Sequence, residues 1–147
     1  MRSYVRVVAL GSMLAAASSR VAAQGVAGAW TVTYDSDINT SGDVVVVKKR
    51  SKGRLVLEQR GDSVFGRFKA DGMPEPERSL SGTFDGKVLE LTTGLARRTI
   101  RINGQPTEMP MRTDWMGAVT GESIRGTMLI QIGNRPAPPR RWEAVRP

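Results

Sequence analysis

The chain has 147 residues, a formal charge of +8, no cysteine and no histidine. These absences exclude thiol nucleophiles, Ser-His-Asp triads and zinc sites that use cysteine or histidine ligands. No loop clusters carboxylates at the spacing of a calcium-binding loop, and we therefore expect neither a metal nor a cofactor.

The first residues predict a secretory signal peptide. Met1–Ala23 has a basic residue at its second position, continues as an apolar stretch and ends in small residues at its last and third-last positions. The apolar run is shorter than the roughly 20 residues that a membrane-spanning helix needs, although a buried N-terminal helix is an alternative. We expect cleavage after Ala23, leaving residues 24–147 as a single exported domain, periplasmic or secreted, that does not span a membrane. Removing Met1–Ala23 takes away three arginines and no acids, which weakens the case for nucleic acid as a partner.

The rest of the chain alternates apolar and polar residues in short runs separated by turn residues, which is typical of β-strands. The first predicted strand is Gly28–Tyr34, and a polar loop is expected over Asp35–Asp43. A valine-rich strand is expected at Asp43–Lys49, followed by a turn at Arg50–Gly53 and a returning strand at Arg54–Arg60.

Hairpin turns recur along the remaining chain. Gly-Asp-Ser-Val-x-Gly begins at Gly61, and the related Gly-Glu-Ser-Ile-x-Gly begins at Gly121. Further strands are predicted around these turns, at 64–69, 78–84, 87–93, 97–102, 109–120, 123–132 and 140–146. No segment after residue 23 shows a sustained helical period, so the fold class is all-β.

Consecutive hairpins favour an antiparallel up-and-down β-barrel of about 8 to 10 strands, because closure removes the exposed strand edges. The higher number requires that both the valine-rich segment and Arg97–Ile102 pair. A β-sandwich is the alternative, and the missing cysteines and the absence of long crossovers count against it.

Three short motifs resemble those of the lipocalins and related calycin barrels. Gly-Ala-Trp at 28–30 matches their Gly-x-Trp signature, and Thr-Asp-Trp at 113–115 is similar to their Thr-Asp-Tyr motif. The closing segment Trp142–Arg146 ends in an arginine that would cover Trp30 through a cation–π contact, a role similar to one in that family. The chain is shorter than a typical lipocalin and lacks a C-terminal helix. The closer similarity is to small exported bacterial lipocalin-like proteins, which implies a barrel that binds an apolar small molecule.

Large side chains on the predicted inner face, and one arginine, are the candidate ligand-binding residues: Trp30, Tyr34, Phe68, Phe84, Arg101, Trp115 and Met128. Trp30 either closes one end of the barrel or lines the pocket, and closure is favoured because large inward aromatics usually belong to the core. Arg101 would hold a carboxylate if it faced inward and would be solvated if it faced outward. Inward glycines either leave room for a cavity or mark sharp bends. The leading hypothesis is binding of a small apolar or amphipathic molecule in the barrel interior.

Two other functions remain open. A barrel enzyme, for instance of the cyclase or isomerase type, would use an interior polar group, for which Asp114, Glu90 and Tyr34 are the candidates.

The second alternative is a module that binds an anionic surface or polymer through a basic hairpin formed by Lys48, Lys49, Arg50, Lys52 and Arg54. The same cluster also fits a solvated hairpin whose lysines discourage edge pairing. Nucleic acid is disfavoured because no aromatic residues are interleaved with the cations.

Overall fold

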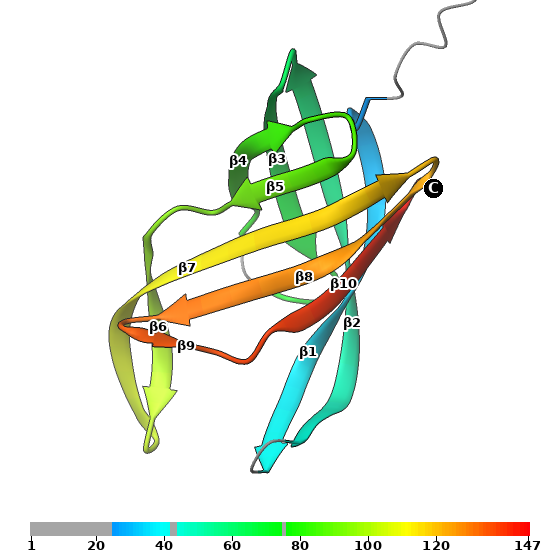
Figure 1. The fold of residues 1–147 in the computed structure, drawn as a ribbon. Coiled ribbons are helices and arrows are strands. Elements are labelled where there is room, and N and C mark those ends of the chain that lie inside the picture. The colour runs from blue at the N-terminus through cyan, green and yellow to red at the C-terminus, as the bar shows by residue number, and fades with distance from the viewer. Residues whose placement is uncertain (1–24, 42–43, 75) are drawn as a thin grey trace, which may run out of the picture.

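The computed structural model describes residues 25–41, 44–74 and 76–147, and the predicted signal peptide Met1–Ala23 lies outside them. Within the described residues the regular structure is entirely β, and no helix is present that could cross a membrane. The strands (Figure 1) are β1 (Gly28–Ser41), β2 (Val44–Arg60), β3 (Ser63–Ala70), β4 (Arg78–Phe84), β5 (Val88–Thr92), β6 (Ala96–Ile102), β7 (Gln105–Thr120), β8 (Ser123–Ile132), β9 (Arg135–Pro136) and β10 (Arg140–Val145).

Eight of these strands form a closed antiparallel ring. The order is β7-β5-β4-β3-β2-β1-β10-β8, and pairing of β7 with β8 closes it. The short strands β6 and β9 pair with β7 and β8 outside the ring. The predicted all-β barrel is therefore confirmed, and the architecture agrees with the calycin-like barrel that the resemblance implied.

The predicted loop at Asp35–Asp43 is wrong over residues 35–41, while its last two residues lie outside the described residues, and the predicted turn at Arg50–Gly53 is wrong. β1 and β2 pair continuously from Gly28↔Leu57 to Ser41↔Val44, with irregularities between Asp35 and Ile38. Beyond Tyr34, β1 no longer pairs with β10, so the two-stranded ribbon leaves the ring and needs no apolar inner face. Figure 1 shows this ribbon and the β6–β7 hairpin extending from the same end of the barrel.

The predicted alternation of inner and outer side chains is confirmed along the ring strands. Val64 and Phe68 of β3 are buried, while Phe65 between them is exposed. Burying an aliphatic or aromatic side chain of this size contributes about 1.5–3 kcal/mol. The fully buried residues come from strands far apart in sequence, so the core is what joins the two ends of the chain.

The inward glycines bring the strands close together and do not create a cavity. A Cβ built on Gly82 would fall on the carbonyl oxygen of Glu90, and one on Gly126 would fall on that of Met116. A Cβ on Gly53 would lie 2.5 Å from the Phe68 ring, which explains a glycine inside β2 where a turn was expected. These glycines therefore allow neighbouring strands to approach closely, and none of them lines the mouth-end cavity described below.

One end of the barrel, which we term the closed end, is sealed by Trp30. The Trp30 side chain is 1% exposed, and its Nε1 donates a hydrogen bond to the Val26 carbonyl at 2.8 Å. The Arg146 guanidinium lies 4.2 Å from the ring centroid and donates to the carbonyls of Ala27 and Gly25, both at 2.9 Å. The predicted cation–π contact is confirmed, and Trp30 belongs to the core.

Candidate ligand-binding site

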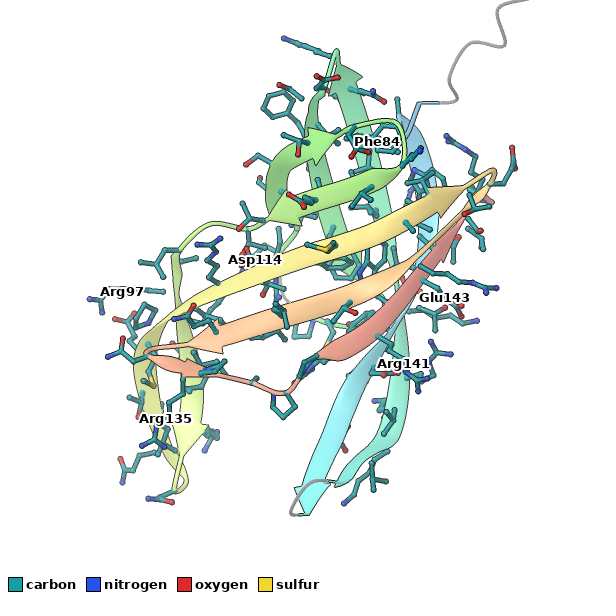
Figure 2. All side chains as sticks on the ribbon, viewed as in Figure 1. Phe84, Arg97, Asp114, Arg135, Arg141 and Glu143 are labelled. Carbon is teal, nitrogen blue, oxygen red and sulfur yellow. The ribbon has the colours of Figure 1, made fainter. Side chains whose placement is uncertain are left out.

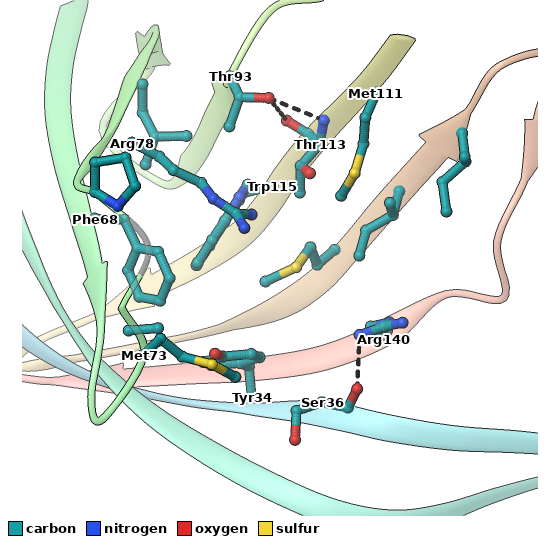
Figure 3. A pocket seen from close by; sticks show the side chains of 16 residues that line it. Tyr34, Ser36, Phe68, Met73, Arg78, Thr93, Met111, Thr113, Trp115 and Arg140 are labelled. Carbon is teal, nitrogen blue, oxygen red and sulfur yellow. Dashed lines mark hydrogen bonds between the residues drawn. The ribbon is translucent and has the colours of Figure 1, made fainter. Parts of the chain in front are cut away.

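The opposite end of the barrel, which we term the mouth, contains a cavity of about 220 Å³ (Figure 3). It lies between the strand ends from which the two ribbons project. Sixteen described residues line it: Tyr34, Ser36, Phe68, Ala70, Met73, Pro76, Arg78, Leu80, Thr93, Met111, Thr113, Trp115, Met128, Ile130, Ile132 and Arg140.

The floor of the cavity is a row of aromatic rings in edge-to-face contact. The ring centroids of Tyr34 and Phe68 are 5.7 Å apart, those of Phe68 and Trp115 are 5.1 Å apart, and those of Trp115 and Trp142 are 5.1 Å apart. Such contacts hold each ring against its neighbours. The apolar floor is consequently preformed, with Met128 buried beside it.

Two buried donors in the lining have no hydrogen-bond partner among the described residues. They are Nε1 of Trp115, a side chain only 4% exposed, and Nε of Arg140. By contrast, Nε1 of Trp142 bonds the carbonyls of Met116 and Thr127 at 3.3 and 3.2 Å. An unsatisfied buried donor costs about 1–3 kcal/mol, so two in one cavity indicate a place for hydrogen-bond acceptors.

The charge in the lining is positive. Arg78 and Arg140 both line the cavity, and no described lining residue is a carboxylate. Figure 3 shows Arg78 reaching into the pocket, while Arg140 Nη1 donates to the Ser36 carbonyl at 2.9 Å. Two cations beside an apolar floor favour an anionic group over a neutral one.

A buried carboxylate on the outer side of the wall holds the neighbour of Arg140 in place. Asp35 is 2% exposed, and its oxygens lie 3.3 Å from Nε of Arg50 and 3.5 Å from Nε of Arg141. The Arg141 backbone N–H also donates to Asp35 at 3.3 Å. Because neighbouring residues of a strand face opposite sides, holding Arg141 outside directs Arg140 to the cavity.

Of the predicted ligand-binding residues, Tyr34, Phe68, Trp115 and Met128 line the cavity, and the other three do not. Trp30 and Phe84 are buried in the core. Figure 2 shows Phe84 within the closed half of the barrel. Arg101 is exposed on β6, where its Nη1 donates to the Gly104 carbonyl at 3.3 Å, because β6 lies outside the ring.

The carboxylates considered for catalysis lie away from the cavity. Asp114 and Glu90 line a groove on the outer wall (Figure 2 labels Asp114), while Tyr34 lies in the cavity lining. Asp114 accepts a hydrogen bond from Arg112 Nε at 2.8 Å, which raises the pKa of Arg112. No group of three or more potential metal ligands occurs among the described residues.

The predicted basic cluster runs along β2 rather than around a hairpin tip. Its members are Lys48, Lys49, Arg50, Lys52 and Arg54, and all five are exposed. Arg50 is partly neutralised because it pairs with Asp35 and lies 3.6 Å from Glu143.

Arg78 and Arg140 were not among the predicted site residues. Both continue the inner-face alternation outward, since Arg78 precedes Leu80 by two positions and Arg140 precedes Trp142 by two. That period of two was the signal that could have identified them. Their proximity in one cavity depends on closure of the barrel.

No protein-family model matches this chain, and neither the curated proteins nor the solved structures include a match.

Proposed function

We propose that this protein is an exported, lipocalin-like carrier that binds a small amphipathic molecule with an anionic head group in the barrel mouth. The observation that carries the proposal is the pair of unpartnered donors, Trp115 Nε1 and Arg140 Nε, in a cavity that also contains Arg78. An anionic head group would supply the acceptors that Trp115 Nε1 and Arg140 Nε lack.

The apolar part of the ligand would lie on the aromatic floor. Phe68, Trp115 and Met128 offer an apolar surface that is already in place, which reduces the entropy cost of binding. The cavity of about 220 Å³ is smaller than the roughly 300–1,000 Å³ of drug-sized pockets. The expected ligand is therefore compact, or only partly enclosed.

Lipocalin-like kinship and export are parts of the same proposal. Kinship is supported by Gly-Ala-Trp at 28–30 and by the Arg146 contact with Trp30. Export is supported by the sequence of Met1–Ala23. N-terminal sequencing of the mature protein is expected to begin at Gln24, and an intact N-terminus would contradict export by cleavage.

The direct test uses straight-chain carboxylates, from hexanoate to dodecanoate, and the alcohols of the same chain lengths. Binding is measured by isothermal titration calorimetry and by the change in tryptophan fluorescence. Charge-assisted hydrogen bonds contribute about 1.5–3 kcal/mol, so each carboxylate should bind roughly tenfold to a hundredfold more tightly than its alcohol.

Substitutions of the lining arginines test whether the mouth produces the preference for carboxylates over alcohols. Arg78→Gln and Arg140→Gln should each reduce carboxylate affinity about tenfold while leaving alcohol binding nearly unchanged. Arg101→Gln is the matched control, because Arg101 is exposed outside the cavity. Equal affinity for carboxylate and alcohol, or equal loss in all three variants, would contradict the anionic head group.

Native mass spectrometry of the freshly purified exported protein gives an independent readout. A stoichiometric amphipathic passenger is the expected result, and extraction would identify its class. Failure of every carboxylate, every alcohol and every extract to yield a bound species would refute interior binding.

A further inference from the structure

The β6–β7 hairpin carries an apolar surface that extends beyond the barrel core. Its inner face and the adjacent β9 segment enclose a groove of about 570 Å³. We term this surface the ledge, and its apolar members are Ile100, Ile102, Met109, Ile132, Pro136 and Ala137. Ile132 also lines the mouth cavity, so the ledge continues the cavity wall outward.

Closure of the barrel does not explain the ledge. β6 and β9 lie outside the eight-strand ring, and β6 pairs with β7 alone. A two-stranded ribbon in water is only marginally stable, and exposed apolar side chains do not improve it. Ile102 is nevertheless 42% exposed at the end of β6.

Four cations lie on the two faces of the hairpin and at its edge. Arg98 shares the face of β6 that carries Ile100 and Ile102, and Arg135 lines the groove, whereas Arg97 and Arg101 are on the opposite face of β6. Arg97, Arg98 and Arg101 belong to β6, and Arg135 belongs to β9; Figure 2 shows Arg97 and Arg135 at this projecting end of the molecule. Glu108 is the single carboxylate between residues 96 and 111, and it pairs with Arg97 at 3.8 Å between two largely exposed side chains. The hairpin therefore combines a net positive charge with an apolar face.

The other projecting ribbon has the same character. Lys48, Lys49 and Lys52 are exposed on β2, and Val46 beside them is 48% exposed. Both ribbons extend from the mouth end of the barrel (Figure 1). Apolar side chains and cations are thus present together on two sides of the cavity entrance.

We propose that the mouth end docks on the surface of an anionic lipid bilayer through the ledge. The isoleucines would enter the boundary between head groups and acyl chains, and Arg98 and Arg135 beside them would contact the lipid phosphates. A docked ledge would place the cavity entrance against the bilayer, where amphipathic molecules reside. Docking rests on the hairpin itself and does not require that the proposed ligand be correct.

Other occupants fit the ledge less well. A second copy of the chain would bring two arginine-rich hairpins together, and like charges oppose that contact. Single-stranded nucleic acid would use aromatic stacking, and residues 96–111 contain no aromatic side chain. A soluble polyanion would satisfy the arginines but would leave the isoleucines in water.

The test is co-sedimentation of the full mature chain with two kinds of vesicle, pure phosphatidylcholine and equimolar phosphatidylcholine and phosphatidylglycerol. Binding to the anionic vesicles should be at least about tenfold stronger and should weaken with added salt. The double variant Ile100→Ser/Ile102→Ser and the triple variant Arg98→Gln/Arg101→Gln/Arg135→Gln should each reduce that binding about tenfold.

The matched control removes three cations from elsewhere on the barrel, Arg60→Gln/Lys87→Gln/Arg125→Gln, and should change vesicle binding by less than about twofold. Equal loss in both triple variants would overturn the proposal, because net charge alone would then explain binding. Unaltered binding of the isoleucine variant, together with equally tight binding of heparin, would indicate a soluble polyanion instead. Dimer formation in analytical ultracentrifugation without vesicle binding would assign the ledge to a second copy.

Measuring carboxylate binding in solution, without vesicles, distinguishes a failure of docking from a failure of the proposed ligand binding. The ledge variants should retain the laurate affinity of the unaltered protein, since Arg78, Arg140 and Trp115 are unchanged. If a ledge variant loses vesicle binding and keeps its laurate affinity, docking is supported independently of the proposed function. If the unaltered protein binds laurate but no vesicle, docking is refuted and the proposed function is unaffected.

Discussion

The two ends of the barrel use the same residue types in opposite ways. At the closed end, Trp30 and Arg146 lie in contact, and Trp30 Nε1 and both terminal nitrogens of Arg146 donate to backbone carbonyls. At the mouth, Trp115 Nε1 and Arg140 Nε have no partner among the described residues. Arg146 Nε also lacks a partner at the closed end, but that guanidinium is held by its other two nitrogens.

This difference separates a structural arginine–tryptophan pair from one suited to a ligand. Hydrogen bonds satisfied within the chain contribute to the free energy of folding, whereas unsatisfied donors reduce it and are available for binding. Stability and function are therefore expected to respond to substitutions at opposite ends of the same barrel.

The largest expected effect concerns packing. Gly126→Ala adds one carbon where the Met116 carbonyl leaves no space, and the free energy of unfolding should fall by about 3 kcal/mol or more. Ala70→Leu adds three carbons to the mouth cavity, and stability should be unchanged or raised by up to about 1 kcal/mol. Urea denaturation measures both. Equal losses would show that the mouth is packed as tightly as the wall at Gly126.

The next effect isolates a single hydrogen bond. Trp30→Phe and Trp115→Phe remove the same ring atoms, but only the first breaks a bond, that of Nε1 to Val26. Trp30→Phe should therefore cost about 1–2 kcal/mol more in the free energy of unfolding. Trp115→Phe should instead weaken binding of the carboxylates. Matching stabilities would contradict the distinction between the two indoles.

A smaller effect is expected for the arginine that covers the closed end. Arg146→Gln removes the cation–π contact and the hydrogen bonds to Gly25 and Ala27, and should lower the free energy of unfolding by about 1–2 kcal/mol. Arg125→Gln, at an exposed position, should change it by less than about 0.5 kcal/mol. Ligand affinity should be the same in both variants, because the mouth is untouched.

The smallest effect is a pH dependence in the β4–β5 turn. Asp85 Oδ1 accepts hydrogen bonds from the backbone N–H groups of Val88 at 2.7 Å and Lys87 at 2.8 Å. These bonds favour the carboxylate, chiefly the one from Val88, and lower the pKa of Asp85 below its ordinary value of 3.8. The stabilisation is therefore present above pH 3.8 and is lost as the pH falls through the lower folded-state pKa.

Asp85→Asn should accordingly unfold at a lower temperature than the unaltered protein near neutral pH. The difference should shrink as the pH drops below 3.8. Thermal unfolding across a pH series measures it, and a difference that persists undiminished in acid would contradict the role of the charge.

Much of the fold was predictable because strand periodicity is local. The period of two placed Leu55, Val64 and Ile124 on the inner face, and all three are buried. The projecting part of the β1–β2 pair was predicted less well than the β6–β7 hairpin. The sequence Asp35–Asp43 has the composition of a loop, and only its pairing with β2 makes most of it a strand.

The site was predictable in part for the same reason. Tyr34, Phe68, Trp115 and Met128 follow from inner-face alternation. The alternation does not show that Trp30 and Phe84 belong to the core and these four residues to the cavity. It identifies the inner face of a strand, but not which end of the barrel is filled by side chains.

The sequence by itself determined that the described residues are all-β and which face of each ring strand is apolar, and the resemblance of its motifs implied that Arg146 covers Trp30. Each of these follows from residue spacing or from motif order along the chain. Only the tertiary structure decided that Arg140, 104 residues after Ser36, lies beside it in the mouth with an unpartnered Nε. Whether a buried donor finds an acceptor depends on residues of other strands that barrel closure brings next to it. Residue spacing within a single strand does not show which residues these are.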